Sequence, residues 1–242
     1  MTVRRLHVPN LPEDGGAVTL DDARARHARV LRLRAGDEVE LFDGSGRFAT
    51  ARLQFMGDAV VCEAAPAISS GTTSTRVVLL LSIPKGSKLD DCVRMATELG
   101  ADEIALMQAA RSVPRWDEAR ARSRIDRLAR IAAEAATQCE RTDIPLVRDP
   151  QTCAGWLEAF PATARGVVFG ARAEGRLTLA ETPEQVWCAI GPEGGFSNDE
   201  LAAFEAAGFV AASLGRLILR VDTAVVAALT VVQDRLALSQ PR

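Results

Sequence analysis

Two glycine-containing segments near the C-terminus have the residue types and the spacing of a small-molecule site. Residues 190–197 read Ile-Gly-Pro-Glu-Gly-Gly-Phe-Ser, and residues 214–224 read Leu-Gly-Arg-Leu-Ile-Leu-Arg-Val-Asp-Thr-Ala. Each segment follows a hydrophobic run and precedes a helical pattern. Glycine lets a ligand approach the main chain closely, and the start of a helix offers free N–H groups. Because ligand sites in α/β proteins form at the carboxyl ends of strands, the two segments are predicted to be two walls of one site.

Three charged side chains could do chemistry there: Glu193 in the first segment, and Arg220 and Asp222 in the second. Each also has a structural alternative. Glu193 can anchor its own loop, and Arg220 can form a surface ion pair. Asp222 and Thr223 can cap the helix that follows. The first segment is neither a Walker A loop nor a Gly-x-Gly-x-x-Gly fingerprint, so the residues alone predict a site without naming its ligand.

Composition excludes several classes of protein. The chain has 242 residues and a net charge of −3, which is not the global signature of a nucleic-acid-binding protein. The five cysteines form no Cys-x-x-Cys pair, and the only histidines are His7 and His27, so no metal site is expected. There is no apolar run of transmembrane length and no core of a signal peptide. We therefore expect a cytoplasmic protein without a membrane partner.

The first third of the chain, residues 1–72, has the pattern of a small β domain. Alternating apolar residues on either side of Asp43-Gly44-Ser45-Gly46 predict a hairpin, and a short helix is predicted over about 20–31. The size and the short strands resemble a small RNA-binding β-barrel. The polar run at 69–74 is predicted to be a linker.

Residues 73–242 alternate between strand and helix patterns, which predicts an α/β domain with a largely parallel sheet. Strands are predicted at 77–81, 104–107, 167–169, 186–190 and 210–214. Helices are predicted to begin at 87, near 116, near 153, at 197 and near 223. Ser87 to Asp90 and Ser197 to Glu200 both fit a capping box.

The two C-terminal segments, taken together, resemble the ribosomal RNA small-subunit methyltransferase E family, which belongs to the SPOUT class of methyltransferases. Further matches follow in the family's order at 30–37, 84–90, 96–100, 111–113 and 132–141. The resemblance therefore covers nearly the whole chain. It implies a PUA-like β-barrel at 1–72 that binds RNA and a SPOUT methyltransferase domain at 73–242, which contains a C-terminal trefoil knot.

The resemblance also implies a cofactor, a reaction and a partner. The cofactor is S-adenosyl-L-methionine, converted to S-adenosyl-L-homocysteine as a methyl group passes to N3 of a uridine in 16S ribosomal RNA. The chain would act on 16S ribosomal RNA or the small ribosomal subunit, as a homodimer formed through the knotted domain. The implied cofactor residues are Phe169, Gly170, Ile190, Gly191, Glu193, Gly194, Gly195, Leu214, Gly215, Ile218, Leu219, Arg220 and Thr223.

Within this reaction, the candidate catalytic residues are Arg220, Glu193 and Asp222. Uridine N3 is a poor nucleophile until it loses its proton. Arg220 would stabilise the negative charge on a uracil carbonyl oxygen. Glu193 or Asp222 would accept the proton, directly or through water.

Candidate RNA contacts lie in an arginine-rich stretch at 24–34 and at a few other cationic or polar positions. Arginine binds phosphate in a bidentate manner, although a single arginine here can equally be a solvated side chain packed along its stem. The candidates are Arg5, Arg24, Arg26, His27, Arg29, Arg32, Arg34, Lys85, Arg111, Arg115, Gln138 and Arg141.

Two other functions stay open on the sequence. One is a SPOUT methyltransferase that acts on another RNA. The other is an RNA-binding ribosome assembly factor without catalysis, because Leu217, Val221 and Asp222 depart from the residues usual in the family.

Overall fold

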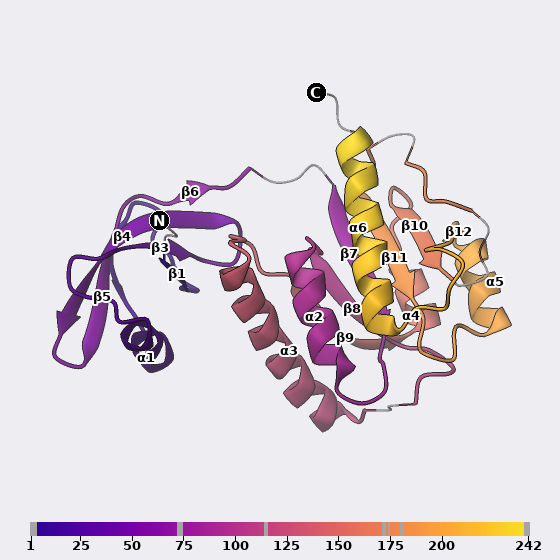
Figure 1. Ribbon diagram of the computed structural model, residues 1–242, viewed down its shortest axis with the longest axis horizontal. Helices are drawn as coiled ribbons and strands as arrows, with labels where there is room; N and C mark the ends of the chain where they lie inside the picture. The colour runs from indigo at the N-terminus through magenta and orange to yellow at the C-terminus, as the bar shows by residue number, and fades with distance from the viewer. Residues whose placement is uncertain are drawn as a thin grey trace. The chain divides into compact units, whose positions relative to one another are not determined.

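The computed structural model describes residues 4–71, 75–113, 116–170, 173, 175–179 and 182–239. Its chain divides into two compact units (Figure 1). Unit 1 consists of Met1–Thr72 and Ala136–Ile144, and unit 2 consists of Thr73–Ala135 and Pro145–Arg242. Segment 136–144 therefore packs with the N-terminal residues, although it lies far from them in sequence.

Unit 1 is built on one mixed sheet of six strands. Its elements are β1 (Arg4–His7), β2 (Gly16–Thr19), α1 (Asp22–Val30), β3 (Glu38–Phe42), β4 (Arg47–Met56), β5 (Ala59–Ala64) and β6 (Ile68–Ser69). The strand order is β1-β3-β4-β5-β2, with β6 against β4. Only β1 and β3 run parallel among these pairs. The alternating inward residues of β4, Ala49, Ala51 and Leu53, lie in the buried core.

The predicted hairpin at Asp43 is confirmed as the connection between β3 and β4. The Asp43 carboxylate accepts hydrogen bonds from the backbone N–H and the hydroxyl of Ser45. It also accepts from the backbone N–H of Arg47 and pairs with the Arg47 guanidinium at 2.7 Å. Gly44 and Gly46 both have positive φ, which glycine adopts without strain. One carboxylate thus organises the whole turn.

Unit 2 confirms the predicted parallel α/β sheet. Its elements are β7 (Arg76–Ser82), α2 (Lys88–Glu98), β8 (Glu103–Gln108), α3 (Glu118–Gln138), β9 (Leu146–Thr152), α4 (Cys153–Glu158), β10 (Arg165–Phe169), β11 (Gln185–Ile190), α5 (Asn198–Ala206), β12 (Val210–Ala212) and α6 (Val221–Ser239). The strand order is β12-β10-β11-β7-β8-β9, and all five pairings are parallel.

Helices cover both faces of this sheet, which explains why β7 is an unbroken apolar run. On one face, α6 packs against α2, and α3 is joined to α2 by an ion pair between Arg127 and Asp90 (Figure 1). On the other face, Trp156 of α4 and Phe204 of α5 lie in a core cluster with Leu80 of β7.

Two local expectations failed. Strand β9 was not predicted, because Pro150 interrupts its pattern; proline is tolerated there since β9 is an edge strand. Ser87 was predicted to close a capping box, but its side chain makes no cap hydrogen bond. The backbone of Ser87 has ψ near 2° rather than the extended value of a capping residue, and Asp90 is paired with Arg127 instead.

Among the residues that the structure describes, no helix has the length and hydrophobicity needed to span a membrane. No group of three or more His, Cys, Asp or Glu side chains in that part of the chain is placed to hold a metal ion.

Candidate active site

A pocket of about 660 Å³ opens at the carboxyl ends of three neighbouring strands, β10, β11 and β12. Its volume is within the range of ordinary small-molecule sites. The main walls are Phe169 and Gly170 after β10, loop 190–197 after β11, and loop 214–220 between β12 and α6. The two glycine-containing segments are therefore brought together, as predicted. Nearly all the predicted cofactor residues line the pocket: Phe169, Gly170, Ile190, Gly191, Glu193, Gly194, Gly195, Leu214, Gly215, Ile218 and Leu219.

Each of the three walls presents a glycine whose bare backbone faces open space. At Gly170, Gly195 and Gly215, apart from the adjoining residues of the chain, no atom of the described residues lies within 4 Å of the place where a Cβ would stand. Gly195 and Gly215 also have φ of +69° and +126°, values that side chains rarely allow. Gly170 has no such constraint, so its lack of a side chain matters for space rather than for backbone conformation. A ligand can approach the main chain at all three places.

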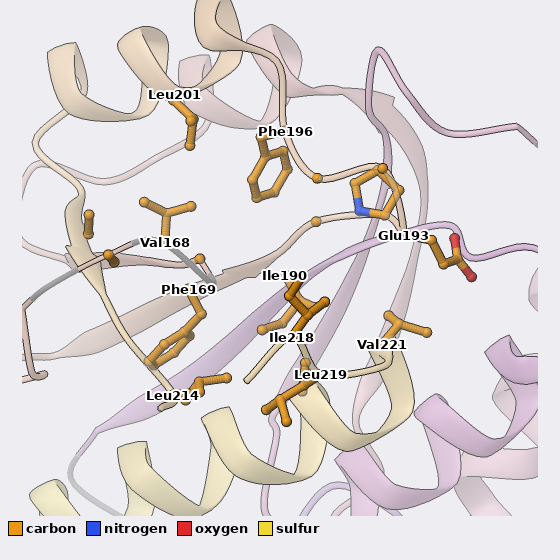
Figure 2. A pocket seen from close by; sticks show the side chains of 18 of the residues that line it. Val168, Phe169, Ile190, Glu193, Phe196, Leu201, Leu214, Ile218, Leu219 and Val221 are labelled. Carbon is orange, nitrogen blue, oxygen red and sulfur yellow. The ribbon is translucent and has the colours of Figure 1, made fainter. Parts of the chain in front are cut away.

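Between the glycines, the pocket wall is apolar. The side chains of Phe169, Ile190 and Leu219 gather with Leu214 and Ile218 around the cavity (Figure 2). Leu217 and Ile218 are 76% and 87% exposed, so the rim formed by loop 214–220 is open to solvent. Several apolar lining residues in or beside the glycine loops were not among the predicted cofactor residues, namely Val168, Ala173, Pro192, Phe196, Leu201, Ala211, Leu217, Val221 and Ala224. Their positions next to the predicted loops were the available clue.

The two candidate proton acceptors contact the segment that leads from β7 into α2. Glu193 lines the pocket, and its Oε1 accepts a hydrogen bond of 3.3 Å from the backbone N–H of Lys85. Its carboxylate lies apart from the apolar side chains (Figure 2). Asp222 is outside the pocket lining and pairs with Lys88 Nζ at 3.4 Å. The predicted alternative, that Glu193 anchors its loop, thus has a concrete contact.

The environment of Asp222 keeps it ionised. Burial acts to raise the pKa of Asp222, but hydrogen bonds from backbone N–H groups and the Lys88 ammonium outweigh it. The pKa of Asp222 therefore lies below its ordinary value. A carboxylate with a lowered pKa is a weaker proton acceptor.

Arg220 and Thr223 are the two predicted cofactor residues that do not line the pocket. Both are exposed, at the end of loop 214–220 and in the first turn of α6. The carbonyl of Arg220 accepts the hydrogen bond from Ala224 N–H that opens the helix. Their side chains are therefore not part of the pocket wall, although Leu219, Val221 and Ala224 next to them are.

Arg111 and Glu200 were not among the predicted cofactor or catalytic residues, yet both contact loop 190–197. Arg111 lines the pocket and donates from one guanidinium nitrogen to the carbonyls of Gly194, at 2.9 Å, and Phe196, at 3.2 Å. Glu200, buried in the first turn of α5, accepts hydrogen bonds from the N–H groups of Ala110 and Ser197. Its capping box with Ser197 was predicted and is confirmed; its bond to Ala110 has no local pattern in the sequence.

The candidate RNA-contacting residues have very different surroundings. Arg5 is buried, pairs with Glu40, and bonds the carbonyl of Arg141, so its guanidinium belongs to the interior of unit 1. Arg24 is half-buried and bonds His7 and Asp21. Arg115 lies outside the described residues.

The remaining candidates are more accessible. Arg26, His27, Arg29, Arg32 and Arg34 are exposed in and after α1. Gln138 is exposed and Arg141 half-buried in the segment of unit 1 at 136–144, and Arg141 pairs with Asp143. Lys85 is exposed in unit 2.

Comparison with known proteins identifies the class of this fold and site. Residues 72–233 match the RNA methyltransferase domain family, and residues 20–61 match the RNA methyltransferase PUA domain. The chain is thus an RNA methyltransferase of the SPOUT-like class with a PUA-like N-terminal domain. A protein of Mycobacterium bovis named ribosomal RNA small subunit methyltransferase E is 32% identical over 237 residues, covering 95% of this chain and 90% of the relative. The chain belongs to the ribosomal RNA small subunit methyltransferase E family, as its sequence predicted.

Solved structures agree over nearly the full length. A ribosomal RNA small subunit methyltransferase E from Neisseria gonorrhoeae, bound to S-adenosyl methionine, has a TM-score of 0.89 and 28% identity, covering 96% of this chain and 98% of that one. A putative methyltransferase from Legionella pneumophila, in complex with the same cofactor, has a TM-score of 0.87 and 25% identity. That match covers 97% of this chain and 98% of the other.

Proposed function

We propose that this protein transfers a methyl group from S-adenosyl-L-methionine to N3 of a uridine in 16S ribosomal RNA. The observation that carries the proposal is the pocket at the ends of β10, β11 and β12, which combines three bare glycine backbones with apolar walls. Membership of the family and the cofactor named in the two solved relatives support the same reaction.

The residues of the pocket fit this cofactor. An adenine ring is flat and largely apolar, and the side chains of Phe169, Ile190 and Leu219 offer it a matching wall. Backbone N–H and C=O groups of loops 190–197 and 214–220 can bind its polar edges where glycines leave space. The bound cofactor supplies an electrophilic methyl group on a sulfonium.

Arg220 is the proposed stabiliser of negative charge on the uracil. Its side chain is exposed at the end of loop 214–220, between the lining residues Leu219 and Val221, and a base entering from solvent would meet it there. A guanidinium stabilises the developing charge on a carbonyl oxygen without giving up its own proton.

Glu193 is the favoured proton acceptor of the two candidates. It lines the pocket, whereas Asp222 does not, and the lowered pKa of Asp222 weakens that group as a base. Asp222 is better suited to hold the start of α6 against α2 through Lys88.

The two predicted domains take complementary roles in this proposal. The N-terminal domain, residues 1–72, binds RNA through the exposed cationic residues in and after α1, and residues 73–242 carry the chemistry. We also propose a homodimer formed through the C-terminal domain, in the cytoplasm, with 16S ribosomal RNA or the small subunit as partner. The trefoil knot stays a prediction of the family resemblance.

Methyl mapping tests the reaction directly. Ribosomal RNA from a strain that lacks the protein would be incubated with the purified enzyme and labelled cofactor, then digested and analysed by mass spectrometry. N3-methyluridine at one position of 16S RNA is expected. Label in another RNA would favour the other SPOUT function, and a protein that binds no cofactor would favour the assembly factor.

A further inference from the structure

We propose that Arg111 and Glu200 are positioning residues that clamp loop 190–197 in the shape that binds the cofactor. The inference rests on the proposed function, because it assigns a role to two residues outside the predicted cofactor set. It also changes the interpretation of Arg111, which the sequence placed among the RNA contacts.

The clamp is reciprocal. A side chain from the turn after β8, Arg111, donates to two backbone carbonyls of the loop, those of Gly194 and Phe196. In the opposite direction, the side chain of Glu200, in the first turn of α5, accepts from the backbone N–H of Ala110 at 2.7 Å. Two adjacent residues after β8 are therefore tied to the segment 194–200 by both a cation and an anion. Hydrogen bonds that involve a charged group are stronger than neutral ones.

The clamp joins the ends of two strands that are not neighbours in the sheet. Loop 190–197 follows β11, and Arg111 follows β8, but β7 lies between these strands in the sheet. No ladder hydrogen bonds join β11 to β8, so the two strand ends must be connected by contacts outside the sheet. The Arg111 and Glu200 contacts span that gap.

The clamped atoms are those that shape the pocket wall. Gly195 has φ of +69° and lies between the two carbonyls that Arg111 holds. Phe196 is 8% exposed and packs edge-on against Phe204, with 5.0 Å between ring centroids. Glu200 also accepts from Ser197 N–H at 2.8 Å, so the same carboxylate sets the start of α5. Release of these bonds would let the backbone around Gly195 rotate.

Four variants test the clamp in the full-length protein. Arg111→Met removes the donors but keeps the length of the side chain, Arg111→Lys keeps a cation that can donate to carbonyls, and Glu200→Gln replaces one acceptor oxygen by an amide. Arg94→Met is the matched control, since Arg94 is an exposed arginine of α2 that pairs with Asp91 away from the pocket. Circular dichroism would check that each variant folds.

Cofactor affinity in the absence of RNA is the first readout, by calorimetry. We expect the Kd for S-adenosyl-L-methionine to rise about tenfold in Arg111→Met and in Glu200→Gln, in line with loss of a hydrogen bond to a charged group. Arg111→Lys should recover part of the loss, and Arg94→Met should bind as the wild type does. RNA affinity should stay unchanged throughout. Wild-type cofactor affinity in Arg111→Met with weakened RNA binding would overturn the clamp and restore Arg111 as an RNA contact.

Hydrogen exchange in the free protein is the second readout, and it does not depend on the proposed function. The backbone amides at 194–197 should exchange faster in Arg111→Met and Glu200→Gln than in the wild type. Unchanged exchange would overturn the clamp. If the wild type bound no cofactor but the amides at 194–197 still exchanged faster in the two variants, the proposed function would fail and the clamp would stand.

Discussion

The position of Arg220 relative to the pocket decides between its two predicted roles. It was predicted both to bind the cofactor and to stabilise charge, but it stands beside the pocket instead of lining it. The structure thus favours an action on the substrate. A charge-stabilising group outside the cofactor wall should affect the rate of methyl transfer and leave cofactor affinity alone.

Replacement of Arg220 by alanine tests this separation. We expect kcat for RNA methylation to fall by about 100-fold or more, the usual effect of losing a group that stabilises transition-state charge. The Kd for S-adenosyl-L-methionine, measured by calorimetry, should change little. Arg165→Ala provides the control, because Arg165 is an exposed arginine at the opposite end of β10. Equal rates in Arg220→Ala and the wild type would remove Arg220 from the mechanism.

Among the elements, the turn between β3 and β4 depends on one side chain. Asp43→Ala would remove every hydrogen bond that the carboxylate accepts, so we expect the free energy of unfolding to fall by roughly 1–3 kcal/mol. Asp58→Ala is the control, since Asp58 is an exposed aspartate after Gly57 in the connection between β4 and β5. Urea unfolding followed by circular dichroism would measure both; similar midpoints for the two variants would contradict the role of Asp43.

The Asp43 carboxylate should also make the stability of the protein depend on pH. Burial acts to raise the pKa of Asp43, but hydrogen bonds from Ser45 and Arg47 outweigh it, so the pKa lies below 3.8, the ordinary value. The stabilising contribution is therefore complete above about pH 4 and is lost as pH falls through the folded-state pKa. Urea midpoints between pH 2 and 6 should fall more steeply toward acid in the wild type than in Asp43→Ala. Parallel profiles would show that Asp43 does not titrate in this way.

Gly166 in β10 and Gly170 just after it allow two substitutions to be compared, one in the core and one at the pocket. A Cβ on Gly166 would stand 2.5 Å from the Phe209 ring, so Gly166→Ala should lower the unfolding midpoint. Among the described residues, a Cβ on Gly170 meets nothing within 4 Å apart from the adjoining chain. Gly170→Val should therefore fold normally but weaken cofactor binding by about tenfold as its side chain enters the pocket. Thermal unfolding and calorimetry would separate the two effects. Normal cofactor affinity in Gly170→Val would place the cofactor elsewhere.

Helix and strand positions followed from local patterns to a large degree. The alternation in 73–242 indicated the parallel sheet, and Ser197 with Glu200 marked the start of α5. Strand β9 was missed because edge strands tolerate proline, which a local pattern interprets as a break. The Ser87 prediction failed because capping depends on a backbone conformation that residue types do not report.

At the scale of the whole molecule, the proposed homodimer would form through the partly exposed side of α6. One side of this apolar helix is buried within unit 2 at Val225, Leu229 and Val232, while Val226 is 37% exposed. A second copy would cover exposed apolar surface of this kind.

A charge at Val226 tests the dimer. We expect Val226→Glu to shift the protein from dimer to monomer, because a carboxylate buried without a partner in an interface is costly. Light scattering after gel filtration would report the mass. Val30→Glu serves as the control, since Val30 is 77% exposed at the end of α1 in unit 1. A wild type that elutes as a monomer would contradict the proposed dimer outright.

The sequence by itself determined the α/β class, the family and the two glycine-containing walls, because these depend on short-range patterns and on the order of motifs. Only the tertiary structure decided which side chains meet at the site. It buried Arg5, set Arg220 outside the pocket, and, across β7, brought Arg111 to loop 190–197 and Glu200 to the backbone of Ala110. For Arg111 and Glu200, the physical reason is that their contacts join residues 83 to 90 positions apart at the ends of strands that are not neighbours. Which strand ends lie close together is a property of the sheet order, and no local spacing encodes it.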